Sequence, residues 1–596
     1  MFLERIHKPK DLKSLTLYQL KDLANEVREY LIDSQARTGG HIGPNLGVVE
    51  LTIALHYIFD SPHDRIIWDV GHQCYVHKML TGRLDAMRTM RQNAGSPGFP
   101  AKDESNHDVL DSSHGGSSLS VALGIALANR QNNVNNLPIA VIGDGALVEG
   151  MVHEALNQIG NEKIRMLIIL NDNGRAIDAN IGAIPNYLSQ LHIGEKVNDK
   201  MFTPLGIEYI GPLDGHNLKT LIINLKKLKN ITKPTVLHIK TKKGMGLPYA
   251  EKDPIQLHFS FPFKKETGEL ITEPIEKNIF YKPKSKFNAV MIGQKITEIT
   301  KKNKDIVIIT PATRGALELH NCFKEVPERC FDVGMAEQHA VTLAAGLSVG
   351  GMKPIVCFQS TFFQRAFDQL VHDICVNKLP VLFILARSGL AGLDHATHHA
   401  PLDLSYLSCV PNLKIFFPID HIEFNIFLEN ISKKWIDSPT ILLFPYGTID
   451  TVEPNNEEKI LLSEDIFDKN NVGIILSTAG RIKSALKIKK MLSKHKINFA
   501  ILNISQIKPL NQELFVKILN RYQKIVTMEE NVIRGGFGSS ICEFAIDNGY
   551  KPEIIRVTLG DVFLEHGMRS YLYKKYNIDE NSILEKIKNR WNFKSS

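Results

Sequence analysis

The residues with the clearest chemical potential follow two short apolar runs. Asp144 stands between two glycines in "VIGDGALVEG", directly after the run 138–143, and "NDN", ending at Asn173, follows the run 166–170. Carboxylate and amide oxygens suit Mg²⁺, which completes its shell with waters and phosphate oxygens, and the glycines allow the backbone to approach a phosphate closely. We therefore predict Asp144 and Asn173 as ligands of a metal that holds a diphosphate. The alternative is a surface turn with unremarkable amides.

Two histidines and one glutamate are further candidates. His41 follows two glycines in "TGGHIGPNLG", and His72 follows a glycine in "DVGHQ". Imidazoles near their ordinary pKa suit proton transfer and phosphate contact, although a single histidine is more often a surface or core residue. Glu337, in "MAEQHA", begins an Ala/Gly-rich helical pattern, where a carboxylate alone is explained by the helix dipole.

Short apolar runs that alternate with amphipathic helical patterns indicate the fold class. Such runs are typical of buried parallel strands with helices on both faces of the sheet. The sequence therefore predicts an α/β protein with doubly wound, mainly parallel sheets. Ligands of such sheets bind at the carboxyl ends of the strands, which is where Asp144 falls. The runs are 138–143, 166–170, 305–310, 353–358, 379–385, 473–477 and 524–528.

The chain length of 596 residues predicts three or more domains of ordinary size. Two polar, Pro-containing stretches without clear periodicity, 259–285 and 447–470, are interpreted as linkers. The predicted domains are 1–280 including its linker, 281–455 and 456–596.

Composition disfavours several functional classes. The net charge of +7 is small for the length, and no Arg/Lys stripe with interleaved aromatics suggests nucleic-acid binding. No uncharged run reaches the roughly 18–20 residues that span a membrane. The 7 cysteines are scattered and form no CxxC pair, which disfavours a zinc site or disulfide framework and predicts a reducing, cytoplasmic location.

The complete motif set resembles the 1-deoxy-D-xylulose-5-phosphate synthase family over essentially the whole chain. The motifs are GGH, DVGHQ, GDG, NDN, "AEKDPIQLH", AEQHA, "STFFQRAFDQ" and "EENVIRGGFGS". The resemblance implies a homodimer of three-domain chains that binds thiamine diphosphate and Mg²⁺ between the first and second domains. It implies condensation of pyruvate with D-glyceraldehyde 3-phosphate, with loss of CO₂, for isoprenoid, thiamine and pyridoxal biosynthesis.

The resemblance also implies roles for individual residues. Asp144 and Asn173 match the metal ligands, and Glu337 matches the carboxyl that hydrogen-bonds the cofactor's pyrimidine N1′ and activates it. The positions that match cofactor-binding residues are His72, Ser113, His114, Gly115, Gly145, Ala146, Asn173 and Leu247. Those that match polar residues handling substrate and protons are His41, His258, Asp394 and His398. Arg365 and Arg387 match cations of the triose phosphate pocket.

Several residues depart from the family pattern. The substitutions are Gly115 and Gly116 for serines, Arg175 for Met, Leu247 and Gln359 for tyrosines, His395 for Gly and Tyr446 for Arg. The loop after Asn173 is also shorter than usual. Because several changes fall in the acceptor pocket, three functions stay open: an active synthase with a weakened triose phosphate site, a thiamine-dependent transferase with another acceptor, and a decayed paralogue without turnover.

Overall fold

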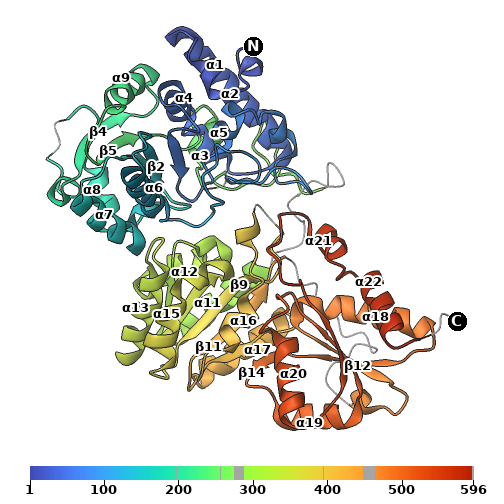
Figure 1. Cartoon of the computed structure of the whole chain (residues 1–596). Coiled ribbons are helices and arrows are strands. Elements are labelled where there is room, and N and C mark those ends of the chain that lie inside the picture. The colour runs from blue at the N-terminus through green and yellow to red at the C-terminus, as the bar shows by residue number, and fades with distance from the viewer. Residues whose placement is uncertain (196–197, 256, 274–287, 393–394, 448–463, 594–596) are drawn as a thin grey trace.

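Three β-sheets, each packed between helices, form the framework of the protein (Figure 1). The computed structural model describes all residues except 196–197, 256, 274–287, 393–394, 448–463 and 594–596. All seven apolar runs predicted as strands are strands in this structure. The predicted doubly wound, mainly parallel α/β class is therefore confirmed.

The first sheet and its helices, here called the first domain, carry the GDG and NDN motifs. Its five strands are all parallel, in the order β1-β2-β3-β5-β4. Side chains alternate between two apolar clusters, as Ile139 and Ala140 illustrate, so both faces of the sheet are buried. The strands are β1 (Arg65–Trp68), β2 (Pro138–Gly143), β3 (Leu167–Asp172), β4 (Glu208–Asp214) and β5 (Thr235–Lys240).

Ten α-helices accompany this sheet within the described residues. They are α1 (Pro9–Leu12), α2 (Leu17–Thr38), α3 (Ile42–Leu46), α4 (Val49–Ile58), α5 (Tyr75–Leu80), α6 (Ser118–Asn132), α7 (Gly150–Glu162), α8 (Ala183–Ser189), α9 (Leu218–Leu228) and α10 (Pro248–Lys252). None of the helices in the described parts of the chain has the length and apolarity needed to cross a membrane.

The second sheet, with its helices, forms the second domain. Its order is β14-β10-β11-β9-β8-β6-β7, with β14 antiparallel at one edge. The strands are β6 (Ile306–Thr310), β7 (Cys330–Asp332), β8 (Lys353–Gln359), β9 (Leu382–Ser388), β10 (Lys414–Phe416), β11 (Thr440–Pro445) and β14 (Gln506–Lys508). The helices are α11 (Asn288–Lys302), α12 (His320–Glu325), α13 (Glu337–Val349), α14 (Ser360–Phe363), α15 (Phe367–Gln369), α16 (Asp403–Ser408) and α17 (His421–Lys433).

The third domain packs directly against the second. Its parallel sheet has the order β13-β12-β15-β16, and one apolar cluster contains residues of both sheets, such as Phe383 and Ile474. The strands are β12 (Gly473–Ser477), β13 (Phe499–Asn503), β15 (Lys524–Met528) and β16 (Glu553–Val557). The helices are α18 (Ile482–Lys494), α19 (Gln512–Arg521), α20 (Phe537–Asp547), α21 (Arg569–Lys575) and α22 (Glu580–Arg590).

The interpretation of 259–285 as a linker is wrong for its first half. Ser260 pairs with Gly40 in a β-bridge, and Phe263 is buried in the core of the first domain. The aromatic side chains, rather than any regular period, anchor this segment. Residues 274–287 lie outside the described residues. In the second predicted linker, Ile466 is likewise buried in the cluster shared by the second and third domains.

Candidate active site

Asp144 lies at the carboxyl end of β2 and is only 2% exposed, so the interpretation as a surface turn is excluded. Its Oδ2 accepts hydrogen bonds from Gly174 N at 2.7 Å and from Asn180 Nδ2 at 2.8 Å. Burial and the neighbouring Asp172 carboxyl raise the pKa of Asp144 well above its ordinary value. Asn173 follows at the end of β3 and accepts a hydrogen bond from Arg175 N. The two predicted metal ligands are thus at the ends of adjacent strands.

The backbone after Asp144 is closely packed. A Cβ on Gly145 would lie 2.9 Å from the Ala176 Cβ, so a side chain at this position would displace the loop after β3. Ala146 then begins the 3-10 helix η3 (Ala146–Val148). Gly145 and Ala146 therefore present backbone rather than bulky side chains beside the predicted metal ligands.

Three histidines from distant segments form a cluster on the same domain. The His41, His72 and His258 ring centroids lie 5.4–5.6 Å apart. Burial lowers the pKa of all three, to about 3 for His41, so they are neutral at physiological pH. The glycine-flanked positions of His41 and His72 indicated this site, whereas His258 was found only through the family resemblance.

Glu337 is the first residue of α13 and is 7% exposed. Burial raises the pKa of its carboxyl, and Arg365 acts in the opposite direction. Its Oε2 is buried and accepts no hydrogen bond from any described residue. A buried carboxyl with an unsatisfied oxygen and a raised pKa has the properties that a proton-sharing group facing a bound ring requires.

The first and second domains meet at the "SHG" motif. The Ser113 hydroxyl hydrogen-bonds that of Thr397, and His114 Nε2 lies 3.1 Å from Thr397 O. Thr361 also donates to Thr397 O, at 2.7 Å. These residues line a cleft of about 310 Å³, together with Arg365. Ser113 and His114, predicted to bind the cofactor, thus lie at the predicted interdomain position.

Phe99 connects the histidine cluster to the second domain. Its ring lies 5.5 Å from that of His41 and 5.0 Å from that of His398. His395 lies 5.9 Å from Phe99 and 3.0 Å from the Thr397 hydroxyl. The structure therefore brings the predicted catalytic residues His41 and His398 to one region. Asp394 lies outside the described residues.

Arg387 lies with two of the altered positions. Its Nη1 donates to Gln359 Oε1 at 3.1 Å, and its guanidinium lies 5.4 Å above the Tyr446 ring. Its φ of 66° and a register shift between β9 and β11 mark a β-bulge, a device that redirects a side chain at functional sites. Arg387, the predicted phosphate-binding cation, thus contacts Gln359 and Tyr446, two residues that depart from the family pattern.

Two predicted site residues have different surroundings from the rest. Arg365 donates to Gly115 O and pairs with Glu149, so its environment differs from that of Arg387. Leu247 is buried in the apolar core of the first domain. The phosphate-binding role of Arg365 and the cofactor-binding role of Leu247 stay predictions.

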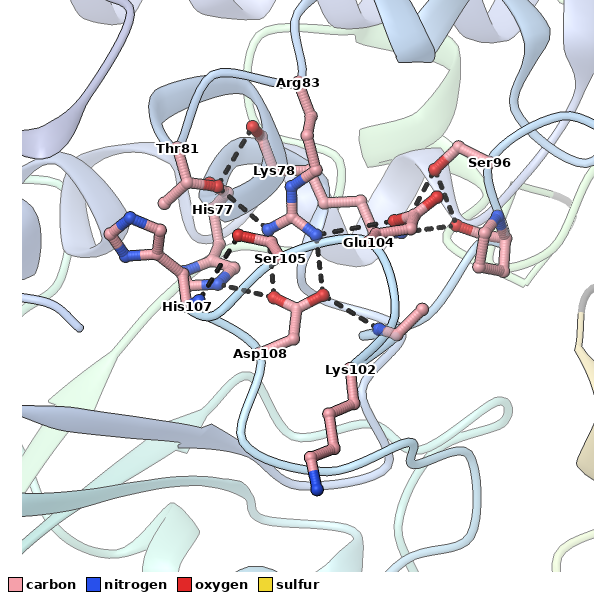
Figure 2. A network of polar contacts seen from close by, with 12 residues as sticks. His77, Lys78, Thr81, Arg83, Ser96, Lys102, Glu104, Ser105, His107 and Asp108 are labelled. Atoms are coloured by element: carbon pink, nitrogen blue, oxygen red, sulfur yellow. Dashed lines mark hydrogen bonds and ion pairs between the residues drawn. The ribbon is translucent and has the colours of Figure 1, made fainter.

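The loop that leads to the "SHG" motif is supported by a buried polar network (Figure 2). Asp108 accepts hydrogen bonds from both terminal nitrogens of Arg83, at 2.6 and 2.9 Å, and contacts His77 at 3.0 Å. Lys78 pairs with Glu104 at 2.5 Å in the same network. The network ties α5, directly after the DVGHQ motif, to residues 96–108.

Sequence reasoning missed two polar residues beside the site. Lys243 is buried and donates to Ala176 O at 2.8 Å, and burial lowers its pKa to about 7. Glu149 pairs with Arg365 across the domain interface. Lys243 stands in an ordinary basic run, and the partner of Glu149 is 216 residues away, so neither carried a local signal.

The residues present fit thiamine diphosphate with a divalent cation. Buried Glu337 Oε2, His72 Nδ1 and His258 Nδ1 have no hydrogen-bond partner among the described residues, which a bound polar ligand would supply. No group of three His, Cys, Asp or Glu side chains gathers as metal ligands in the described regions.

Comparisons with known proteins agree with these motifs. Residues 3–200 and 194–241 match the 1-deoxy-D-xylulose-5-phosphate synthase family, residues 288–449 the transketolase pyrimidine-binding domain, and residues 468–583 the transketolase C-terminal domain. The 1-deoxy-D-xylulose-5-phosphate synthase of Halothermothrix orenii is 40% identical, covering 98% of this chain and 96% of its own. That of Listeria monocytogenes is 41% identical, with the same coverage. Transketolase from Campylobacter jejuni is 17% identical, covers 96% of this chain and 100% of its own, and has a TM-score of 0.43. The chain belongs to the 1-deoxy-D-xylulose-5-phosphate synthase family.

Proposed function

We propose that this chain is a thiamine diphosphate- and Mg²⁺-dependent transferase that condenses pyruvate with D-glyceraldehyde 3-phosphate to 1-deoxy-D-xylulose 5-phosphate. The observation that carries the proposal is buried Glu337, with its unsatisfied Oε2 and raised pKa, at the start of α13. It comes from the domain opposite the one that carries Asp144 and Asn173. Relatives named 1-deoxy-D-xylulose-5-phosphate synthase, which match this chain over nearly its full length, support this assignment.

Each part of the site has one proposed role. Asp144 and Asn173 would hold the cation, and the Gly145–Ala146 backbone would contact the diphosphate. When bound, thiamine diphosphate would supply a carbon nucleophile for the keto carbon of pyruvate. Glu337 holds or shares a proton at the pyrimidine ring. His41 and His398, neighbours through Phe99, hold the substrate and move protons.

The acceptor pocket is proposed to be functional but weak toward phosphate. Arg387 retains a permanent charge, whereas Tyr446 offers a ring in place of the expected second guanidinium. Because Arg387 stays at the site, we favour the synthase activity over a transferase with a different acceptor. The homodimer and the cytoplasmic location stay predictions.

A turnover assay tests the proposal against its alternatives. The purified chain is incubated with thiamine diphosphate, Mg²⁺ and pyruvate, with and without glyceraldehyde 3-phosphate. The proposal expects 1-deoxy-D-xylulose 5-phosphate and CO₂ only when the triose phosphate is present at sufficient concentration. If pyruvate is consumed only when another aldehyde replaces glyceraldehyde 3-phosphate, the result would favour a transferase with a different acceptor. Absence of thiamine diphosphate binding would favour the decayed paralogue.

A further inference from the structure

A buried cluster of charges joins the first and second domains beside Glu337. Glu149, the residue before α7, is 2% exposed, and Arg365 belongs to the 3-10 helix η7 (Gln364–Ala366). Arg365 Nη1 forms a close ion pair with Glu149 Oε2, and its Nη2 donates to Gly115 O at 2.6 Å. The same Nη1 lies 4.0 Å from Glu337 Oε2. One guanidinium thus faces carboxyls from both domains.

Glu149 fills space that Gly115 and Gly116 leave. A Cβ on Gly115 would lie 2.0 Å from Glu149 Oε1, and one on Gly116 would lie 2.4 Å from Oε2. The family resemblance leads us to expect serines at both glycine positions. The carboxyl of Glu149 therefore occupies the volume that those side chains would need. Asp69 fixes the same turn by accepting from Gly116 N at 2.9 Å and Ser118 N at 3.0 Å.

Three buried carboxyls compete for this guanidinium. Burial raises the pKa of Glu149 well above its ordinary value; Arg365 lowers it, and Asp69 and Glu337 raise it further. The pKa of Glu337 is raised by burial and lowered by Arg365. How strongly Arg365 stabilises the charged form of Glu337 therefore depends on how much of its field Glu149 neutralises.

We propose that Glu149 and Arg365 are a positioning pair for Glu337 across the domain interface. Glu149 holds the guanidinium in place and shares its charge, so that Glu337 retains a proton for the pyrimidine ring. The inference rests on the proposed function, because it takes Glu337 as the group facing the cofactor. It gives Arg365 a role other than the phosphate contact implied by resemblance.

The isosteric variant Glu149→Gln separates charge from packing. It keeps the side-chain shape and removes the negative charge of Glu149, so Arg365 then acts more strongly on Glu337, with Asp69 as the remaining competitor. The stronger effect of Arg365 should lower the pKa of Glu337, so its proton is lost at a lower pH than in the wild type. We therefore expect the fall in hydrogen–deuterium exchange at thiazolium C2 with rising pH to begin about one pH unit lower in the variant. Glu162→Gln is the control, because Glu162 ends the same helix and pairs with Arg130 at the surface. A Glu149→Gln profile identical to wild type would overturn the proposal.

A second measurement needs neither cofactor nor turnover. Gly115→Ser is introduced into the wild-type chain and into Glu149→Gly, and thermal unfolding of the apo proteins is followed. We expect the serine to lower the unfolding temperature of the wild type clearly, and to lower it much less in the Glu149→Gly chain. If Gly115→Ser lowers the unfolding temperature equally in the wild-type and Glu149→Gly chains, or lowers it in neither, the result would contradict the placement of Glu149.

The two measurements also separate the inference from the proposed function. A wild type that binds no thiamine diphosphate would overturn the proposed function and, with it, the role assigned to the pair. A wild type that binds and exchanges normally, with a Glu149→Gln variant that does the same, would overturn the inference alone.

Discussion

At the scale of single residues, the proposed chemistry depends on side chains whose surroundings oppose their ordinary charge states. Glu337 is a carboxyl whose pKa is raised by burial, and the His41 imidazole has its pKa lowered to about 3. A carboxyl with a raised pKa and an imidazole with a lowered pKa are neutral over a wider range of pH than usual, so each adds less charge to a buried site. The role of Glu337 can be tested directly.

Replacement of Glu337 by Ala is expected to leave thiamine diphosphate binding largely intact and to abolish its activation. The diphosphate is proposed to bind residues of the first domain, whereas Glu337 belongs to α13 of the second. Hydrogen–deuterium exchange at C2 should therefore become slow while calorimetric affinity changes little. Fast exchange in the variant would leave Glu337 as a helix-start charge only.

Replacement of Tyr446 by Arg is expected to lower the KM for glyceraldehyde 3-phosphate by about ten- to a hundredfold and to leave the pyruvate KM unchanged. A hydrogen bond to a charged group contributes roughly 1.5–3 kcal/mol, and the new guanidinium would join Arg387. Steady-state kinetics with each substrate measure both constants.

Tyr446→Leu is the control, because it removes the ring without adding a charge. A similar fall in the KM for glyceraldehyde 3-phosphate in Tyr446→Leu and Tyr446→Arg would mean that the ring had merely obstructed the pocket. An unchanged constant in Tyr446→Arg would mean either that residue 446 does not face the phosphate or that His395 already replaces the lost charge. His395→Gly separates these cases, since only the second expects a further rise in KM.

At the scale of elements, the site is positioned by loops whose stability comes from buried polar contacts. The segment that carries Ser113 and His114 has few regular elements, and the Asp108 network fixes its approach to the domain interface (Figure 2). Burial acts to raise the pKa of Asp108, but hydrogen bonds from His77 and Arg83 hold it well below its ordinary value.

Asp108→Ala is expected to destabilise the first domain by roughly 3–5 kcal/mol, because buried Arg83 would lose the carboxylate that contacts both of its terminal nitrogens and keep Glu104, 3.4 Å away, as its acidic partner. The pKa of Asp108 is lowered by folding, so its contribution is present above the unfolded value near 4 and is lost as pH falls. Urea denaturation should show that the difference in free energy of unfolding between wild type and Asp108→Ala is smaller below pH 4 than at neutral pH. Asp103→Ala, exposed in the same loop, should differ little from wild type.

The elements also show how far sequence patterns reach. Apolar runs such as 473–477 predicted strands because Ile and Leu side chains fill both faces of a covered sheet. The three-residue strand β14 was missed, since its pairing with β10 depends on contact between two domains. Asp144 and His72 were recognised from local motifs, and the role of Glu337 was predicted through the family resemblance. Glu149 carried no such signal, because its partner Arg365 belongs to another domain.

At the scale of the whole molecule, the proposed cofactor site belongs to two domains. Asp144 comes from the first and Glu337 from the second, and contacts such as Ser113–Thr397 and Glu149–Arg365 close the interface around it. The third domain packs on the second and places Met568 N 2.7 Å from Asn93 Oδ1 of the first. A ligand that binds both domains stabilises their association as well as its own site.

Thiamine diphosphate with Mg²⁺ is therefore expected to raise the unfolding temperature of the wild-type chain, because a ligand at 100 times its Kd stabilises the folded state by about 2.7 kcal/mol. Asp144→Ala should lose most of this rise, with affinity at least about tenfold weaker by calorimetry. Asp547→Ala, exposed on α20 in the third domain, is the control and should keep the full rise. Chelation of Mg²⁺ should reduce the rise in wild type and leave the Asp144→Ala chain almost unaffected. An equal rise in wild type and Asp144→Ala would mean that the cofactor is held without this carboxylate, and the metal-ligand assignment would then be wrong.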